Sequence, residues 1–437
     1  MKKVLVIGAA KSGIAVSKLL AQNGYDVILN DRNEISDKEN LIKLGIKVID
    51  KEHPESLKNK DYEFIVKNPG IPYFNPFVKY FVDNDIKIYT EIEIAYWFSS
   101  NYKYGAITGT NGKTTITSML YEILNYDNNA VAAGNIGTPL SEVVYLNDNK
   151  DLDVALELSN FQLLGIEKFR PVVSVISNLA PDHLDYMSSE ESYYESKCNI
   201  YMNQKEEDYF LLNVDDELVV KYAKDIKCKV IKFSTIRKDV DLYIDNNCVY
   251  LNDTLLFDIS ILKVVGIHNI SNAMVASCMA LKMGISIEII REQLSKFKAV
   301  EHRLEYVGSK NNVKYFNDSK ATNTQAVETA LKSFDNNIIL LIGGYDKGIP
   351  FDPLKQYDSR IKQCIAFGQT KDKFNDIFSN VKVVEDIKEA LSYANKITEE
   401  NDVVLLSPAC SSFDQFKSYE HRGRVFKELV YEFIGGK

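Results

Sequence analysis

A glycine-rich turn sets the strongest limit on the fold of this chain. The turn reads Gly109-Thr110-Asn111-Gly112-Lys113-Thr114, and it follows an apolar strand expected at 104–107 and precedes an amphipathic helix expected at 116–124. Glycines let backbone N–H groups converge on phosphate, the lysine meets phosphate charge, and the threonine hydroxyl can bind magnesium. The common spacing would need glycine where the chain has Ile107. The pattern therefore predicts a shortened ATP-binding loop.

Strand and helix patterns alternate along the 437 residues, which is too long a chain for one hydrophobic core. We expect an α/β protein of three domains in series. These are a Rossmann-like sheet at 1–92, a central ATP-binding domain at 93–299 and a further Rossmann-like sheet at 300–437. Apolar runs predict strands at 4–7, 26–29, 47–49, 64–66 and 88–89, then at 104–107, 154–156, 172–176 and 209–212, and finally at 313–316, 338–342, 364–367 and 403–406.

Composition excludes several classes of protein. Acidic residues outnumber basic ones by 61 to 52 with no long basic run, so a nucleic-acid partner is not expected. The six cysteines are scattered without a Cys-x-x-Cys pair, which favours reduced thiols and a cytoplasmic location. The apolar start 4–10 is short and is broken by Lys11, so we interpret it as a first strand and not as a signal peptide. No stretch reaches the roughly 18 apolar residues that a membrane span requires.

The first turn, Gly8-Ala9-Ala10-Lys11-Ser12-Gly13, has two of the three glycines of the dinucleotide fingerprint. Ala10 stands where the second glycine would let a diphosphate approach. Asp31 ends the second strand near the spacing of a ribose-binding acid, although a solvated strand-end carboxylate is equally consistent with it. We favour a nucleotide or nucleotide sugar here over NAD.

Magnesium ligands are expected at the ends of two buried strands of the central domain. Glu157 follows one strand, where a carboxylate needs a cationic partner, and the polar segment 178–185 follows another. His183 in that segment is an unusual magnesium ligand and could instead cap a helix. Lys197 lies in a polar helical stretch that reads, by itself, as a solvated face.

Other polar residues gather later in the chain. Asn269 and Asn272 open a helix that they could cap, or they could bind a base. Beyond Val300, four polar turns are each expected to follow a strand and to share a cleft. These turns are 301–303, 317–323, 343–348 and 407–416.

Taken together, these motifs resemble the Mur ligase family of peptidoglycan synthesis over essentially the whole chain. The resemblance rests on the 109–115 loop, Glu157-Leu158-Ser159, Asp182-His183, His268-Asn269 with Asn272, Glu301-His302-Arg303 and 318–323, which occur in the familial order and spacing. Within the family, the chain looks most like the members that add D-glutamate. That narrower likeness rests on the one-sheet first domain, on Asn68-Pro69-Gly70-Ile71 and on the ending 407–423.

The resemblance implies an ATP-dependent ligase that joins D-glutamate to UDP-N-acetylmuramoyl-L-alanine through an acyl phosphate. It implies catalytic roles for Lys113, His183, Lys197 and Lys320. Two magnesium ions would be held by Thr114 with Glu157 and by His183 with a carbamylated Lys197, since a carbamate supplies the hard anionic oxygen that magnesium prefers. It implies ATP binding by Gly109, Thr110, Asn111, Gly112, Lys113, Thr114, Thr115, Asn269, Asn272, Arg303 and Asp318.

The resemblance also implies the remaining substrate contacts. The UDP substrate would be bound by Lys11, Ser12, Asp31, Arg32, Gly70, Asn135 and His183. D-glutamate would be bound by Thr322, Lys347, Ser412 and Tyr419. The chain departs from the subfamily at Asp31-Arg32-Asn33, where Asp-Thr-Arg is common. No nucleic acid, no membrane and a monomer are expected.

Three other hypotheses remain. A folylpolyglutamate synthetase shares the central and C-terminal motifs but not the first sheet. An NAD-dependent dehydrogenase would explain only the turn at 8–13 and would leave the phosphate loop without a role. A nucleotide-gated binding module would keep ATP binding but form no amide.

Overall fold

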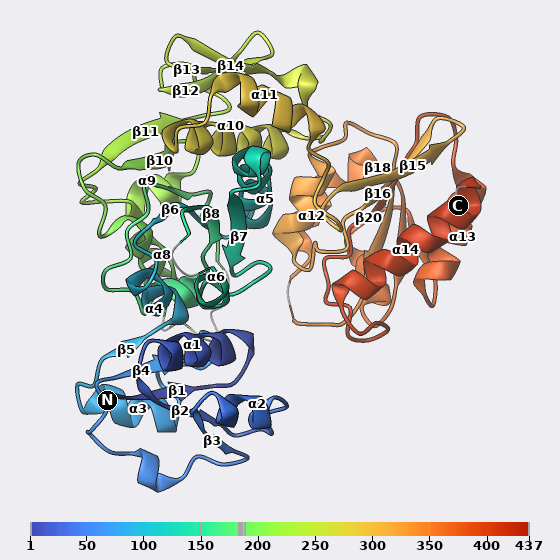
Figure 1. Ribbon diagram of the computed structural model, residues 1–437. Coiled ribbons are helices and arrows are strands. Elements are labelled where there is room, and N and C mark those ends of the chain that lie inside the picture. Colours follow the sequence, from blue (N-terminus) through green and yellow to red (C-terminus); the bar gives the residue numbers. More distant parts are fainter. Residues whose placement is uncertain (1, 148–149, 182–186, 188, 349, 436–437) are drawn as a thin grey trace. The chain divides into compact units, whose positions relative to one another are not determined.

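The computed structural model describes residues 2–147, 150–181, 187, 189–348 and 350–435 (Figure 1). Three α/β sheets follow one another along the chain, as the sequence predicts. The chain divides into two compact units, Met1–Ile261 with Ser271–Ser295, and Leu262–Ile270 with Lys296–Lys437. The first unit contains two of the sheets and the second unit contains the third. The predicted boundaries at 92 and 299 fall between the strands of successive sheets.

The first sheet is wholly parallel, in the order β3-β2-β1-β4-β5. Val4 and Val6 pack with α1 and α2 on one face, while Leu5 and Ile7 pack with α3 on the other. Burial on both faces explains the unbroken apolar run of this strand. The elements are β1 (Lys3–Ile7), α1 (Lys11–Gln22), β2 (Asp26–Asp31), α2 (Lys38–Lys43), β3 (Lys47–Asp50), β4 (Phe64–Lys67), α3 (Pro76–Asp83) and β5 (Ile88–Tyr89).

Helix α4 (Glu91–Trp97) follows the first sheet and ties it to the second. The buried Glu93 carboxylate accepts hydrogen bonds from the backbone N–H groups of residues 167–169 at 2.9–3.0 Å, and from the Trp97 indole at 2.7 Å. The Trp97 ring packs edge-on against Phe64 and Tyr89 of the first sheet. One short helix therefore contacts both sheets.

The second sheet has the order β14-β13-β12-β11-β10-β9-β6-β8-β7, with an antiparallel β12-β13-β14 end. Its phosphate-loop strand β6 lies between β8 and β9. The elements are β6 (Tyr102–Thr108), α5 (Lys113–Leu124), β7 (Ala130–Gly134), α6 (Leu140–Leu146), β8 (Leu152–Glu157), α7 (Asn160–Leu163), β9 (Val173–Ile176), α8 (Glu190–Cys198), β10 (Tyr209–Asn213), α9 (Glu217–Tyr222), β11 (Lys229–Phe233), β12 (Leu242–Asp245), β13 (Cys248–Leu251), β14 (Thr254–Asp258), α10 (Ile267–Lys282) and α11 (Ile287–Lys296).

The third sheet has the order β15-β16-β20-β17-β18-β19, and only the β15–β16 pair is antiparallel. Every residue of β17 is buried, as its uninterrupted apolar sequence predicts. The elements are β15 (Glu305–Lys310), β16 (Val313–Asn317), α12 (Thr324–Leu331), β17 (Ile338–Gly343), β18 (Ile361–Phe367), β19 (Val381–Val383), α13 (Ile387–Ile397), β20 (Val403–Leu406) and α14 (Tyr419–Ile434).

Among the described residues, no helix combines the length and apolar character that crossing a membrane requires. All six cysteines are free thiols.

One detail of the prediction was wrong. The turn 301–303 does not follow a strand but lies between α11 and β15.

Candidate active site

The phosphate loop joins β6 to α5, and its two glycines have backbone conformations that other residues rarely adopt. Gly109 has φ 143° and Gly112 has φ 82°. A Cβ atom at position 109 would lie 2.0 Å from the Ser177 Oγ, so glycine is required there by space as well as by conformation. The loop therefore opens directly onto the N-terminus of α5, where N–H groups point outward.

A second turn, at the end of β9, fixes the shape of this loop. The Asn178 carbonyl accepts a 2.9 Å hydrogen bond from the Thr110 N–H, and the Asn178 Oδ1 accepts a 2.8 Å bond from the Asn111 N–H. Ser177 and Asn178 both donate to the Asn111 carbonyl, at 2.6 and 2.9 Å. The phosphate loop thus contacts the first residues of the 178–185 segment, in which magnesium ligands were expected. Asp182 and His183 lie outside the described residues.

Two lysines converge on the Gly109 carbonyl. Lys113 Nζ donates to the carbonyls of Gly109 and Thr110, each at 2.8 Å, and Lys197 Nζ donates to Gly109 at 2.9 Å. Lys197 is 1% exposed and lies 4.5 Å from the centre of the Tyr193 ring. It is therefore not on a solvated face, although its local sequence alone reads that way. Both cations lie at the loop that would hold phosphate.

Glu157, at the end of β8, is the next member of this group. The side chain is 2% exposed, its Oε1 accepts a 2.7 Å bond from Asn135 Nδ2, and its Oε2 is buried without a hydrogen-bond partner among the described residues. A buried carboxylate oxygen without a donor is costly unless a cation binds it. Oxygen is also the ligand that magnesium prefers, so this residue fits a magnesium site. Asn135 follows β7 of the second sheet and is bonded to Glu157, whereas the predicted UDP contacts at 11–12, 31–32 and 70 belong to the part of the chain that forms the first sheet.

The predicted nucleotide-binding residues fall in both units. Asn272 lies next to the phosphate loop, since a Cβ at Gly112 would come within 3.0 Å of its Oδ1. Thr114 and Thr115 belong to the first turn of α5. Asn269 belongs to the second unit and donates from Nδ2 to the Val265 carbonyl at 2.8 Å, as a residue that supports the helix start would.

Asp318, also in the second unit, follows β16 and is 9% exposed. Its oxygens accept a 3.1 Å bond from the Leu304 N–H and a 2.8 Å bond from the Ser407 hydroxyl. Burial raises the pKa of Asp318 to about 7, against opposing influences from Arg303 and Arg422. The contacts join three of the four polar turns: 301–303 through Leu304, 317–323 and 407–416.

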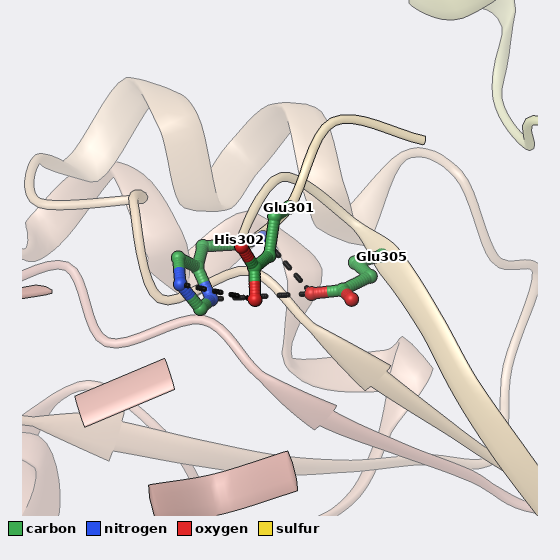
Figure 2. Close-up of side chains that lie close together, drawn as sticks. All are labelled: Glu301, His302 and Glu305. Carbon is green, nitrogen blue, oxygen red and sulfur yellow. Dashed lines mark hydrogen bonds and ion pairs between the residues drawn. The ribbon is translucent and has the colours of Figure 1, made fainter. Parts of the chain in front are cut away.

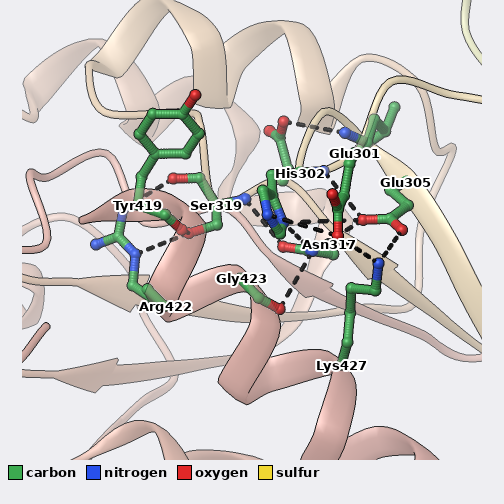
Figure 3. Close-up of polar contacts among 11 residues, drawn as sticks. Glu301, His302, Glu305, Asn317, Ser319, Tyr419, Arg422, Gly423 and Lys427 are labelled. Atoms are coloured by element: carbon green, nitrogen blue, oxygen red, sulfur yellow. Dashed lines mark hydrogen bonds and ion pairs between the residues drawn. The ribbon is translucent and has the colours of Figure 1, made fainter. Parts of the chain in front are cut away.

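Arg422 on α14 is fully buried and holds two of these turns together, 317–323 and 407–416, through the contacts that Figure 3 shows. Its guanidinium donates to the Ser319 Oγ and carbonyl at 3.0 and 2.8 Å, and to the carbonyls of Cys410 and Ser411 at 3.0 and 3.3 Å. The predicted residues Lys320 and Ser412 are adjacent in sequence to these contacts, and the Tyr419 carbonyl accepts a 2.8 Å bond from the Ser319 Oγ. Lys320 Nζ lies 3.9 Å from the centre of the Tyr419 ring.

Two predicted D-glutamate residues are not joined to this set by hydrogen bonds among the described residues. Thr322 is half-buried, and Lys347 is exposed in the turn after β17. Their roles remain predictions. Arg422 was not named as a site residue from the sequence. Its position three residues after Tyr419 on one helix was the only local signal, because every partner lies at least 11 positions away.

Glu301, His302 and Glu305 bring three potential metal-ligand atoms within 4.8 Å of one another (Figure 2). The Lys427 ammonium already lies against both carboxylates, at 2.9 and 2.6 Å. His302 is 3% exposed, its Nδ1 lies 2.9 Å from Asn317 Nδ2, and burial lowers its pKa. The lysine supplies the positive charge, so this cluster is a structural ion-pair network that orients the 301–305 turn.

A cavity of about 380 Å³ opens at the carboxyl end of the first sheet. Of the predicted UDP contacts, Asp31, Arg32 and Gly70 line it. Lys11 and Ser12 begin α1, and Ser12 Oγ accepts a 3.1 Å bond from Asn68 Nδ2, a residue of the cavity wall. The wall consists of Ile7, Gly8, Ala10, Asp31, Arg32, Asn33, His53, Asn68, Gly70, Ile71, Pro72 and Asn75.

Asp31 organises one side of this cavity. Its two oxygens accept hydrogen bonds from the N–H groups of Ala9, at 2.7 Å, and Asn33, at 2.8 Å. Asp31 thus connects the Gly8–Gly13 turn with the end of β2. His53, which also lines the cavity, was missed from the sequence because its partners are distant in the chain.

Two family models match the chain beyond its first domain. The Mur ligase middle domain matches residues 107–280, and the Mur ligase, glutamate ligase domain matches residues 302–410. Curated relatives match over the whole length. The UDP-N-acetylmuramoylalanine--D-glutamate ligase of Geobacillus kaustophilus is 40% identical over 442 residues, covering 99% of this chain and 98% of the relative. The protein of the same name from Bacillus subtilis is 40% identical over 438 residues, covering 98% and 97%.

Solved structures with the same fold include a pseudomurein peptide ligase type C from Methanothermus fervidus, with a TM-score of 0.60 and 20% identity. The UDP-N-acetylmuramate-alanine ligase MurC from Thermotoga maritima has a TM-score of 0.59 and 19% identity. Each match covers 99% of this chain and 100% of the other. These similarities confirm the predicted arrangement of α/β domains in series.

Proposed function

The chain belongs to the Mur ligase family, and on that basis we propose that it adds D-glutamate to UDP-N-acetylmuramoyl-L-alanine. The reaction forms one amide bond and converts ATP to ADP and phosphate, as a step in peptidoglycan precursor synthesis. The observation that carries this proposal is the likeness to D-glutamate ligases along the whole chain. That likeness includes the first domain, which neither family model covers.

The phosphate loop would bind the ATP phosphates through its backbone N–H groups and through Lys113. The shape that Ser177 and Asn178 impose on the loop supports this role, because it sets the loop before substrate arrives. Phosphoryl transfer depends chiefly on positioning and on compensation of negative charge. Asn269, Asn272, Arg303 and Asp318 would contribute the remaining nucleotide contacts.

Thr114 with Glu157, and His183 with Lys197, would hold two magnesium ions. The buried, unpartnered Glu157 Oε2 supports the first site. Bound magnesium would neutralise charge on the phosphate oxygens. For the second site we propose that the Lys197 ammonium loses one proton, and that the resulting amine adds carbon dioxide and loses a second proton, which converts a buried cation into an oxygen ligand.

The chain's own residues would then arrange the acceptor and the amine. An oxygen of the L-alanine carboxylate would take the γ-phosphoryl group, giving an acyl phosphate. The D-glutamate nitrogen would attack its carbonyl carbon, so that a C–N bond forms, the C–O bond to phosphate breaks, and the amine loses a proton. Lys320, with Thr322, Lys347, Ser412 and Tyr419, would bind D-glutamate. Asn135 would approach the acceptor carboxylate.

The uridine diphosphate part would lie in the first-domain cavity, with the diphosphate near Lys11 and Ser12 at the start of α1. We also propose domain limits of 1–92, 93–299 and 300–437, a monomeric enzyme and a cytoplasmic location. The six free thiols support that location. All the residues assigned to substrates and magnesium belong to a single chain, which is consistent with the proposed monomer.

Phosphate release tests the proposal. The enzyme is supplied with ATP, magnesium and UDP-N-acetylmuramoyl-L-alanine, and with D-glutamate, L-glutamate, L-alanine or no amine. We expect release with D-glutamate only, accompanied by a new amide product in the mass spectrum. Release with another amino acid would keep the ligase class but contradict the choice of D-glutamate, and no release under any condition would contradict the ligase assignment.

A further inference from the structure

The cavity of the first domain extends along the edge of the sheet past the ends of three neighbouring strands. A bound nucleotide could place its diphosphate, ribose and base at these three ends in turn. Gly8 and Ala10 follow β1, Asp31 and Arg32 follow β2, and His53 follows β3, which is the outer strand of the order β3-β2-β1. Two strand spacings amount to about 10 Å. A nucleotide whose diphosphate lies at the β1 turn, and whose ribose lies at Asp31, would therefore place its base beside His53.

The hydrogen bonds of Asn30 fix which nitrogen of His53 carries the proton. Asn30 is fully buried, and its Nδ2 lies 2.9 Å from the Ile49 carbonyl and 2.8 Å from the Glu52 carbonyl. Both carbonyls can only accept, so the Asn30 amide nitrogen must face them and its Oδ1 must face His53. The Oδ1 lies 2.5 Å from His53 Nδ1, which must therefore be the donor. In a neutral ring this leaves Nε2 as an acceptor.

The ring is also held in position. It stacks on Phe77 of α3 with ring centres 4.5 Å apart and planes inclined by 10°. Burial lowers the pKa of His53, with Asp31 opposing and Arg32 reinforcing the effect, so the ring is neutral at pH 7. Among the described residues, Nε2 has no hydrogen-bond partner. The His53 ring therefore contributes a fixed hydrogen-bond acceptor to the lining of the cavity.

We propose that His53 selects the base of the nucleotide substrate, by accepting a hydrogen bond at Nε2 from the N3–H of uracil. This inference rests on the proposed function only in taking the substrate to be a uridine nucleotide. Uracil presents a donor at N3 between two carbonyl acceptors, and the exposed Arg32 in the same wall can donate to one of those carbonyls. Cytosine has a lone pair at N3, which would face the lone pair of Nε2. The site therefore discriminates between the two pyrimidines.

Calorimetric titration with UDP, CDP and N3-methyl-UDP tests this in the unaltered enzyme, with 5-methyl-UDP as a control for added bulk. We expect CDP and N3-methyl-UDP to bind about tenfold or more weakly than UDP, since each lacks the donor. In His53→Phe, which keeps a ring to stack on Phe77, the preference for UDP over both analogues should shrink to about twofold or less. The ATP affinity of this variant should be unchanged.

Glu55→Gln is a matched control, because Glu55 lies near His53 in sequence and, among the residues that the structure describes, its side chain pairs only with Lys58. Its base preference should equal that of the unaltered enzyme. Equal binding of UDP and N3-methyl-UDP by the unaltered enzyme would overturn the inference, and so would an undiminished preference in His53→Phe. Failure of the proposed function is separate, since it would appear as no D-glutamate-dependent turnover.

Discussion

At the level of single residues, Lys113 holds its Nζ 2.8 Å from the carbonyl oxygens of Gly109 and Thr110 and so lies within the phosphate loop. Lys197 adds a second positive charge from α8. The glycines and Lys113 were predictable because their pattern is local. The roles of His53 and Arg422 were not, because they depend on partners 23 and up to 103 positions away.

Replacing Lys113 by alanine should separate chemistry from folding. We expect Lys113→Ala to lower kcat/KM by about 10³-fold, because the charge that compensates the transferring phosphoryl group is lost. The melting temperature should change by only a few degrees. Lys103→Ala on the exposed side of β6 is the control and should retain normal turnover. Near-normal turnover of Lys113→Ala would contradict the role of the loop.

Lys67, at the end of β4, should make stability depend on pH. It is fully buried and donates to the carbonyls of Asn68 and Ile71 at 3.2 and 2.7 Å. Burial lowers its pKa to about 7 from the ordinary value of 10.5. Between these values only the unfolded chain binds the proton, so the free energy of unfolding rises with pH by up to about 1.4 kcal/mol per pH unit. Below pH 7 the cost of burying the charge is fully present.

In Lys67→Met this contribution disappears. The stability of the variant relative to the unaltered enzyme should therefore be highest at pH 7 or below, and this difference should decrease as the pH rises to 9. Melting temperatures at pH 7, 8 and 9 measure the difference. Lys79→Met, at an exposed position of α3, should show a constant difference. A constant difference for Lys67→Met as well would refute the expectation.

At the level of elements, α14 matters because its buried arginine joins two turns that follow different strands. The four hydrogen bonds of Arg422 reach the turn after β16 and the turn after β20. Parallel strands bring such turns to one edge of the sheet, which the sequence could predict. It could not show what fixes the spacing between the turns.

Arg422→Lys should disturb D-glutamate binding more than ATP binding. A lysine cannot reproduce the planar fork that meets carbonyls in both turns, so the turns carrying Lys320 and Ser412 should lose their fixed spacing. We expect the KM for D-glutamate to rise about tenfold with a smaller change in the KM for ATP. Steady-state kinetics measure both. Arg424→Lys, exposed on the same helix, should leave both constants unchanged, and an equal response of the two variants would count against this role.

The predicted strands were correct where buried apolar runs were unbroken, as in β1 and β17. Others were missed. β7 has the small residues Ala-Val-Ala-Ala-Gly, and β12 to β14 form antiparallel hairpins whose burial is mixed. Asn246 and Asn247, with φ of 45° and 62°, mark the first of these turns. Paired asparagines between short strands are the signal that would have identified it.

At the level of the whole molecule, the chain divides into two compact units with separate cores. The sequence predicted the number of sheets, since each of the first two begins with a strand, a turn and a helix, and the strands expected beyond residue 313 are separated by helical segments. It could not predict that residues 262–270 belong with the C-terminal unit while 271–295 belong with the first. That assignment depends on contacts between distant parts of the chain.

Separate cores should unfold in separate steps. Calorimetry of the full chain should show at least two transitions. Leu340→Ala, at a fully buried position of β17, should destabilise the second unit by about 2–5 kcal/mol and lower only one transition. Leu156→Ala, fully buried in β8, should lower the other. One transition that shifts equally in both variants would show that the enzyme unfolds as a single unit.

Helix α4 gives the enzyme an optical reporter of its own. Trp97 is the only tryptophan in the chain, and its indole is bonded to Glu93 and packed against Phe64 and Tyr89. Emission excited at the red edge of the indole band therefore comes from one place, where the first sheet meets the second. A shift of that emission would signal loosening of this junction, without any label being attached.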